Sequence, residues 1–380
     1  MPSKPAPTSR AGVALRQYAD ELLALGRSAG LDRVGIAPAR PFERARVAIE
    51  HRVAHGYADS MQFTFRSPER STDPSATLPG ARSIFVGAIG YHEPDPVARP
   101  EGKPTARVAR YAWRDNYEAL RASLGVVADE LRSVGHRAVV LADDNALVDR
   151  EAAHLAGLGW FGKNANLLLQ GSGSWFVLGS IITDAVLPAS TPVADGCGAC
   201  RRCIDACPTG AIVEPGVIDA ARCIAWVLQK PGVIDSSLRG VIGDRIYGCD
   251  DCQESCPPSV RSAREGVDAV VAGAEAFVDP VAILDMTDAQ ILAAHGRWYI
   301  HDRDPRWVRR NALVVLGNVA TPSDAAAREV LAGYVADADP VLRAHAVWAV
   351  ARIGHADLVP ADDPDDVVRR ELNDLPPVRG

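Results

Sequence analysis

The sequence lacks any long apolar run. No stretch of its 380 residues approaches the roughly 20 consecutive apolar residues that a membrane-spanning helix needs. The first ten residues are polar and rich in proline, and no apolar segment of the kind found in secretory leaders follows them. We therefore expect a soluble, cytoplasmic protein that has no membrane partner, and we expect it to act as a monomer.

An excess of basic residues is also missing. The chain has 41 Lys and Arg residues against 48 Asp and Glu residues, so its formal net charge is −7. Proteins that coat nucleic acid through bulk electrostatics normally carry a basic domain or stripe, so any contact with RNA here needs a local patch. The densest candidate patch consists of Arg297, Arg303, Arg306, Arg309, Arg310 and Arg343. The alternative is an ordinary solvated face of a helical repeat, balanced by Asp302, Asp304 and Asp339.

The order of apolar patterns indicates the fold class. Between Ala11 and about Thr183, helical patterns alternate with short apolar runs, which is typical of an α/β layer structure. The predicted helices are Leu15–Ala29, Phe42–His55, Asn116–Val134 and Asp149–Ala156. The predicted strands are Arg33–Ala37, Ser83–Tyr91, Arg137–Leu141 and Trp175–Ile182. With 47% hydrophobic and 23% charged residues, the chain has the composition of a globular protein with two or three cores.

A repeated pattern follows beyond about residue 279. Segments that start at Asp304-Pro305 and Asp339-Pro340 continue as Ala-, Val- and Leu-rich helical patterns and end at Gly317 and Gly354. A degenerate third copy starts at Asp363-Pro364. A recurring Asp-Pro start followed by an amphipathic helix is typical of HEAT-like repeats. Two unrelated helices with similar caps are the alternative.

The eight cysteines all lie between Cys197 and Cys256. The first four follow the ferredoxin spacing C-x2-C-x2-C-x3-C-P, in which three thiolates hold one [4Fe–4S] cube and the fourth reaches a second cube. The last three repeat the second half of this run, and Cys223 takes the place of its missing first member. We therefore predict two clusters, one held by Cys197, Cys200, Cys203 and Cys256, and the other held by Cys207, Cys223, Cys249 and Cys252.

Two other uses of these cysteines fit less well. Disulfides are disfavoured by a reducing compartment and by the tight clustering of the thiols. Zinc sites also use Cys-x2-Cys pairs, but they have no use for three evenly spaced cysteines followed by a fourth. Two neighbouring clusters form an electron relay, and we expect the relay to end at an acceptor within the protein.

A glycine-rich segment, Gly157–Gly162, fits the pattern G-x-G-x-x-G. A dinucleotide-binding loop leaves a strand and opens a helix, whereas this segment follows a predicted helix, so we do not expect NAD or FAD there. With Lys163 and Asn164 after it, the segment could place backbone amides and a cation beside a large polar ligand. A helix end with a turn is the alternative.

Asp143 and Asp144 follow the predicted strand Arg137–Leu141, at the edge where open α/β sheets place ligands. A carboxylic acid beside an apolar cofactor can donate a proton if desolvation raises its pKa. The alternative is that the pair caps the next helix.

Together these motifs resemble the epoxyqueuosine reductases. The likeness runs from about Leu15 to Pro257. It rests on both cysteine runs and on Leu78–Ser83, Arg110–Ala112, Asp149–Glu151, Gly157–Asn164 and Arg245–Gln253. The resemblance implies an α/β cobalamin-binding domain like that of reductive dehalogenases over residues 1–187 and a ferredoxin-like two-cluster module over residues 188–262. HEAT-like repeats over residues 263–380 complete the expected architecture, as in some members of the family.

The resemblance also implies a function and a set of site residues. Members of this family convert epoxyqueuosine to queuosine in tRNA, through attack of cob(I)alamin on the epoxide and donation of a proton. The electrons pass through the clusters from a donor that the sequence does not identify. By this resemblance Asp143 is the proton donor and Tyr117 lies near the substrate. The implied cobalamin contacts are Arg66, Asp143, Trp160, Gly162, Lys163 and Asn164.

Three segments depart from the family pattern. Asn116, Tyr117 and Glu118 stand where Asp-Tyr-His is usual. Residues 225–230 read Ala-Trp-Val-Leu-Gln-Lys where Ser-Tyr-Leu-Thr-x-Glu is usual, and residues 258–259 read Pro-Ser where Trp-Asn is usual. Because of these departures, a second hypothesis stays open: the protein is a corrinoid iron–sulfur reductase that acts on another small molecule. A non-catalytic electron carrier or HEAT scaffold is a third hypothesis, but a carrier needs only the cluster module.

Overall fold

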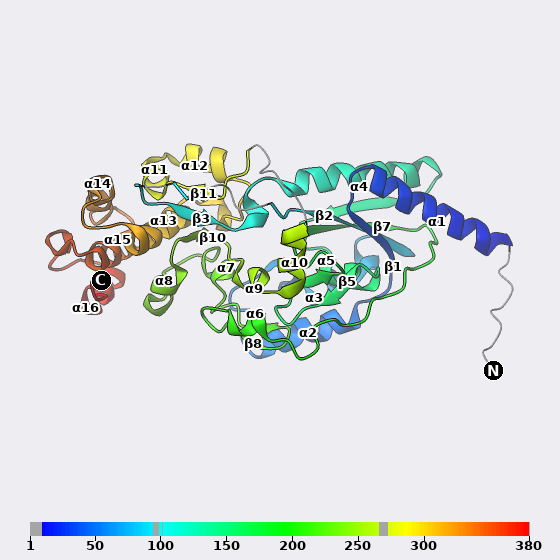
Figure 1. The fold of residues 1–380 in the computed structure, drawn as a ribbon, viewed down its shortest axis with the longest axis horizontal. Coiled ribbons are helices and arrows are strands. Elements are labelled where there is room, and N and C mark those ends of the chain that lie inside the picture. The colour runs from blue at the N-terminus through cyan, green and yellow to red at the C-terminus, as the bar shows by residue number, and fades with distance from the viewer. Residues whose placement is uncertain (1–9, 94–98, 101, 266–272, 380) are drawn as a thin grey trace.

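The structure is a computed structural model that describes residues 10–93, 99–100, 102–265 and 273–379. Figure 1 shows an elongated arrangement with the α/β layers near one end and the repeat helices near the other. Two short helices that carry cysteines, α6 (Arg202–Asp205) and α9 (Asp251–Glu254), lie between the two ends.

The main sheet has four strands in the order β1-β2-β7-β4, and every neighbouring pair is antiparallel. The strands are β1 (Arg33–Pro38), β2 (Ser83–Gly90), β4 (Ala138–Ala142) and β7 (Phe176–Thr183). The four strands predicted from apolar runs are confirmed to within two residues at each end. The two central strands are buried along most of their length, which explains why they are continuous apolar runs rather than alternating ones.

Four helices cover this sheet: α1 (Arg10–Ser28), α2 (Glu43–Ala54), α4 (Asn116–Ser133) and α5 (Asp149–Leu155). Side chains of β2 alternate between the two layers, so Phe85 packs with α1 and α4, whereas Ile84 and Val86 pack with α2 and α5. Asp115 caps α4, because its carboxylate accepts hydrogen bonds from the backbone N–H groups of Tyr117 and Glu118. All four predicted helices are confirmed, and α1 begins earlier than predicted.

A second, three-stranded sheet joins distant parts of the chain. Its middle strand β3 (Ala106–Val108) pairs in parallel with β10 (Arg245–Tyr247) and antiparallel with β11 (Phe277–Val278). Apolar side chains of β3 and β10 share one core with the repeat helices. The α/β segment, the cysteine segment and the repeat segment each contribute one strand.

The repeat region contains α11 (Pro280–Asp285), α12 (Asp288–His295), α13 (Arg306–Val319), α14 (Ala325–Tyr334), α15 (Pro340–Ile353) and α16 (Asp366–Asn373). The helix starts predicted after Asp304 and Asp339 are confirmed, with α13 packed against α15. The third helix begins two residues later than its pattern predicts, because Asp365 caps it. Asp363 instead accepts two hydrogen bonds from Arg343, at 2.9 Å each.

The predicted arginine patch on this region loses one of its six residues to the core. Arg310 has an exposed fraction of 0%. Arg306 is paired with both Asp304 and Asp339, and Arg309 with Asp288. Helix geometry turns Arg310 into the core, and nearby carboxylates neutralise its neighbours.

Shorter elements complete the description. The short strands are β5 (Gly159–Phe161), β6 (Leu167–Leu169), β8 (Ile212–Glu214) and β9 (Val217–Ile218). The remaining α-helices are α3 (Pro68–Ser71), α7 (Ile224–Val227), α8 (Ser236–Ile242) and α10 (Pro257–Glu265). No helix within the described ranges is long and apolar enough to cross a membrane.

Candidate redox site

The cysteine thiols fall into two neighbouring sets. Burial and then the nearby Cys256, Cys197 and Cys200 raise the pKa of the Cys203 thiol. In the second set, burial and then Cys249 and Cys223 raise the pKa of Cys252, and Cys207 adds to the effect of burial on the pKa of Cys223. Cys203 also contributes to the raised pKa of Cys252, so the two sets adjoin.

The surroundings of the thiols suit cluster ligation. The backbone N–H of Ala211 donates to the sulfur of Cys207 at 3.2 Å, and backbone hydrogen bonds from Ala225 and Trp226 lower the pKa of Cys223 against the larger effect of burial. N–H groups directed at sulfur are the outer contacts that stabilise metal-bound thiolates. Burial raises the pKa of Cys249 to about 12, so this thiol stays protonated until a bound metal replaces the proton.

The arrangement differs from a single-ion site. Among the described residues, no three His, Cys, Asp or Glu side chains lie close enough together to hold one metal ion. A [4Fe–4S] cube needs no such convergence, because each of its four thiolates binds a different iron atom.

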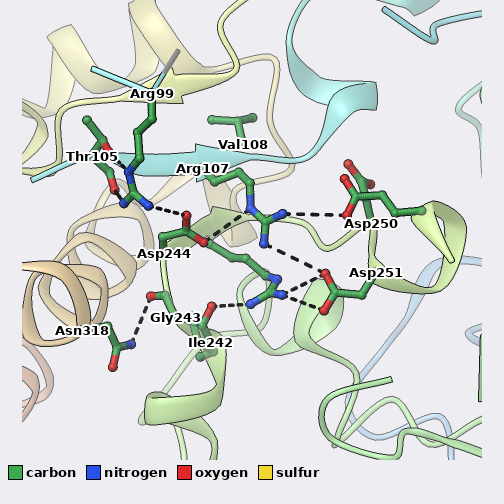
Figure 2. Close-up of polar contacts among 12 residues, drawn as sticks. Arg99, Thr105, Arg107, Val108, Ile242, Gly243, Asp244, Asp250, Asp251 and Asn318 are labelled. Atoms are coloured by element: carbon green, nitrogen blue, oxygen red, sulfur yellow. Dashed lines mark hydrogen bonds and ion pairs between the residues drawn. The ribbon is translucent and has the colours of Figure 1, made fainter. Parts of the chain in front are cut away.

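A network of ion pairs surrounds the cysteine segment that follows β10. Figure 2 shows Arg107 of β3 between Asp244 and Asp251, with contacts of 3.4 Å and 4.0 Å. Arg245 binds both carboxylate oxygens of Asp251, at 2.6 Å and 2.8 Å. Burial raises the pKa of Asp250 to about 6, although the backbone N–H of Arg110 donates to its carboxylate at 2.7 Å. These contacts fix the short helix α9, which carries Cys252.

A cavity of about 690 Å³ lies beside the second set of thiols. Cys223, Cys249 and Cys252 form part of its wall. The other walls include apolar side chains of α2, four tyrosines and three arginines, which are Ala45, Ala48, Ile49, Tyr57, Tyr91, Tyr111, Tyr117, Arg44, Arg52 and Arg150. A largely apolar cavity of this size with a few polar groups is typical of a cofactor site.

Two of the residues expected near the cofactor or substrate, Tyr117 and Asn164, line this cavity. The amide of Asn164 donates to the carbonyl of Cys252 at 3.2 Å, so it links the β5–β6 hairpin to the cysteine segment. Burial is the largest cause of the raised pKa of Tyr117, followed by the carboxylates of Asp143 and Asp149.

Five other expected cofactor contacts, Asp143 among them, are not among the residues that line the cavity. Arg66 is exposed and follows the short helix of residues 63–65. Trp160 is buried against Leu168 and Cys256. Lys163 donates to the carbonyl of Gly198 at 2.7 Å. Gly162 lies in the hairpin turn beside Asn164, and the structure places it next to the cavity wall rather than in it.

The glycine-rich segment begins as a helix end and continues as the β5–β6 hairpin. A hairpin thus follows the segment where a dinucleotide-binding loop would open a helix. Gly157 has a φ of +74°, and a Cβ atom there would lie 2.3 Å from the carbonyl oxygen of Thr191. Glycine is therefore required by a backbone contact at this position.

Asp143 and Asp144 have different environments. The Asp144 carboxylate accepts a hydrogen bond from the N–H of Ala146 at 2.8 Å, which is a turn contact. Asp143 has a φ of +56°. Partial desolvation raises its pKa, Arg121 opposes this effect, and Asp144 adds to it. The sequence pattern placed both residues at the ligand-binding edge of an open α/β sheet. That reason does not hold, because all neighbouring strands of the sheet are antiparallel.

Asp149 is a candidate site residue that the sequence reasoning did not select. It belongs to α5, and burial raises its pKa to about 8, although the Ser180 hydroxyl donates to it. Asp149 is therefore protonated near neutral pH and can donate a proton. Its signal in the sequence was its place at the start of the motif Asp149–Glu151.

The residues that depart from the family pattern have structural partners. Asn116 donates to the backbone carbonyl of Tyr111 at 3.0 Å, and Glu118 is exposed. Trp226 and Lys230 both donate to the same oxygen of Asp59, at 2.9 Å each. The buried Ser259 accepts a hydrogen bond from the N–H of residue 174 at 3.2 Å, on the segment before β7.

Comparison with known proteins identifies three parts of the chain. Residues 71–144 match the family described as "Epoxyqueuosine reductase QueG, DUF1730". Residues 196–259 match the 4Fe-4S double cluster binding domain, and residues 297–374 match HEAT repeats. The fold and the thiol site thus define an oxidoreductase with two [4Fe–4S] clusters.

Similar proteins narrow this class. An epoxyqueuosine reductase of Bacillus cereus is 31% identical over 89% of this chain and 90% of its own length. One of Xanthomonas campestris is 33% identical over 87% of this chain and 94% of its own length. The chain belongs to the epoxyqueuosine reductase family.

Solved structures of the family share the whole architecture. An epoxyqueuosine reductase crystallised with an epoxyqueuosine-modified stem loop of tyrosine tRNA has a TM-score of 0.84 and 29% identity, over 94% of this chain and 97% of that one. A Bacillus subtilis structure with the same TM-score and 28% identity covers the same shares of the two chains, and has its catalytic aspartate loop swung out of the active site.

Proposed function

We propose that this protein reduces epoxyqueuosine to queuosine in tRNA and uses a cobalamin bound in the cavity of about 690 Å³. One observation carries the proposal: three thiols of the second cluster set form part of the cavity wall. Electrons that reach this cluster are therefore delivered directly to whatever the cavity holds. The similar structure that contains an epoxyqueuosine-modified stem loop supports tRNA as the substrate.

The chain supplies the surroundings of the reaction. Removal of the epoxide oxygen as water consumes two electrons and two protons. Bound cobalamin supplies a strongly nucleophilic cobalt. Apolar side chains of α2 and the tyrosines line the cavity, while the two clusters store and pass electrons. The other set has the exposed Cys200, so the donor most readily delivers electrons there.

We assign the proton donor to Asp143, with Asp149, whose pKa burial raises to about 8, as a neighbouring carboxyl group. Both carboxylates influence Tyr117, which lines the cavity, and both have a raised pKa. The loop position of Asp143 is consistent with the mobile aspartate loop of the Bacillus subtilis relative. Asn164 is the proposed direct contact to the cofactor, while contacts of Arg66, Trp160, Gly162 and Lys163 with it stay predictions.

The other hypotheses receive less support. The exposed Glu118 and the backbone contact of Asn116 give no specific reason for another small-molecule substrate. A cofactor-sized cavity beside the thiols argues against a simple carrier or scaffold. A tRNA substrate supports a cytoplasmic location. The monomeric state and the domain boundaries after residues 187 and 262 stay predictions.

Two measurements test this function. Anaerobically reconstituted protein mixed with cobalamin should show the absorption bands of a protein-bound corrinoid, which a carrier or scaffold would not. Nucleosides from the tRNA of a deletion strain should contain epoxyqueuosine in place of queuosine when analysed by mass spectrometry. Unchanged queuosine in that strain would show that the substrate is a different one.

A further inference from the structure

A buried arginine of the repeat helix α13, Arg310, contacts the segment that begins at Cys223. Cys223 is the N-cap of the short helix α7. The last carbonyl groups of a helix have no partner within it. The Arg310 side chain donates to four carbonyls at the end of α7 and in the following turn, those of Val227 (3.2 Å), Leu228 (3.3 Å), Lys230 (2.7 Å) and Gly232 (2.8 Å).

Asn311 extends this contact to a second cysteine segment. Its amide nitrogen donates to the carbonyl of Leu228 at 2.8 Å and to that of Ile246 at 3.1 Å. Ile246 belongs to β10, and Cys249 follows shortly after it in the chain. One amide group therefore joins the backbone after Cys223 to the backbone before Cys249.

The two side chains also fix each other. The oxygen of Asn311 accepts hydrogen bonds from Nε and Nη2 of Arg310, at 3.1 Å and 2.9 Å. The guanidinium of Arg310 lies 5.4 Å from the centre of the Trp307 ring. Burial lowers the pKa of Arg310 to about 9, and Arg239 adds to this effect. The buried charge is compensated mainly by carbonyl oxygens, so its orientation depends on the position of the cysteine segments.

We propose that Arg310 and Asn311 are positioning residues for the cluster beside the cavity. They hold the segments of Cys223 and Cys249 at the spacing that one [4Fe–4S] cube requires. Helix α13 of the repeat region is thus a functional part of the cluster module. Within the described residues, the hydrogen bonds from the Arg310 and Asn311 side chains to the backbone reach residues 227–232 and 246, and none reaches the segment of the other thiol set. The inference rests on the cluster assignment within the proposed function and does not depend on the tRNA substrate.

The test variant is Asn311→Asp, which keeps the shape of the side chain but turns the donor into an acceptor facing two carbonyl oxygens. Iron content should fall from about eight to about four atoms per chain, since one of the two cubes is lost. Electron paramagnetic resonance of the reduced protein should lose the signal of the cavity-side cluster and keep that of the other.

Asn318→Asp is the matched control on the same helix. The Asn318 amide also donates to two carbonyls, that of Arg239 at 2.7 Å and that of Gly243 at 3.1 Å. Figure 2 shows the contact with Gly243. Both carbonyls lie further from Cys249 along the chain than that of Ile246. This variant should keep about eight iron atoms. Full iron content and an unchanged spectrum in Asn311→Asp would overturn the proposal, and so would equal iron loss in the two variants.

If Asn311→Asp does not fold, the milder variant Arg310→Lys tests the positioning role. Arg310→Lys keeps the charge, but an ammonium group cannot reach all four carbonyls in the fork geometry of a guanidinium. A chelator should then remove iron from the cavity-side cluster faster than in the unaltered protein. An unchanged rate of removal would overturn the proposal. Selective iron loss in a protein that does not act on tRNA would leave this inference intact and remove only the proposed substrate.

Discussion

At the scale of single residues, the two aspartates after β4 differ in what they contact. Asp144 is engaged by the N–H of Ala146. Asp143 has a backbone conformation that side chains rarely adopt, and its carboxyl group affects the pKa of Tyr117 on the cavity wall. Strained backbone of this kind is often found at active sites. Neither residue caps α5, whose N-cap is Val148; Asp144 closes a turn instead.

The first prediction separates these two residues. Asp143→Asn should keep both clusters and bound cobalamin but lower turnover by about 10²- to 10⁴-fold, which is the usual contribution of a general acid. Asp144→Asn is the adjacent control and should change turnover much less. Single-turnover assays of the reconstituted enzymes measure both. Equal turnover in Asp143→Asn and the unaltered enzyme would contradict the assignment.

The second prediction concerns Asp149 and pH. Its pKa is raised from 3.8 to about 8 in the folded protein, so the folded chain keeps a proton that the unfolded chain releases at lower pH. The resulting stabilisation is present at low pH and is lost as the pH rises towards about 8. Asp149→Asn should therefore gain thermal stability relative to the unaltered protein as the pH increases from about 5 to about 8. A difference in melting temperature that is constant across this range would contradict the raised pKa.

At the scale of secondary structure, the β5–β6 hairpin connects the cavity to the cysteine segment. A Cβ atom on Gly162 would lie 2.6 Å from the side-chain oxygen of Asn164, whose amide donates to the carbonyl of Cys252. The hairpin therefore leaves no room for a side chain at this position. Glycine here is explained by the packing of Asn164 and not by a phosphate-binding loop.

The third prediction uses this contact. Gly162→Ala should displace Asn164 and weaken cobalamin binding by about tenfold, which corresponds to about 1.4 kcal/mol, while iron content stays the same. Gly125→Ala is the control, because a Cβ atom at that helical position meets nothing within 4 Å. Titration of the reconstituted proteins with cobalamin, followed by absorption, measures both. Equal affinities in the two variants would remove Asn164 from the cofactor site.

The sequence predicted the long elements well and the short ones poorly. The main strands and helices bury continuous or periodic apolar patterns, which can be recognised locally. The β3-β10-β11 sheet was not predicted, because strands of two or three residues have no periodicity and pair across more than 100 residues of sequence. The predicted start of α16 was two residues too early, because Asp363 binds Arg343 and Asp365 caps the helix.

The cysteine site could be inferred from spacing alone, but the cavity could not. Its wall combines α2, α4, the β5–β6 hairpin and the segments after Cys223 and Cys249, which only the tertiary fold brings together. Burial also removes Arg310 from the predicted arginine patch, because its side chain belongs to the core. A charged residue on a helical pattern does not show by itself which face it occupies.

At the scale of the whole molecule, the repeats and the cluster module share one apolar core. Side chains from β3, from α7 and from the repeat helices pack together in it. The repeat region therefore supports the redox site mechanically, whatever contacts it makes with RNA. Loss of the repeats should destabilise the cavity-side cluster before it affects the α/β layers, which have their own cores on both faces of the main sheet.

The fourth prediction is the most direct test of the central claim that electrons pass through the cavity-side cluster to reduce epoxyqueuosine. The reconstituted enzyme, with cobalamin and a chemical reductant, is incubated with tRNA that carries epoxyqueuosine, and the nucleosides are analysed by mass spectrometry. The unaltered enzyme should yield queuosine, lighter by one oxygen atom, and Cys223→Ser should yield none while keeping about four iron atoms. Unconverted epoxyqueuosine with the fully loaded enzyme, or equal conversion by Cys223→Ser, would contradict the account.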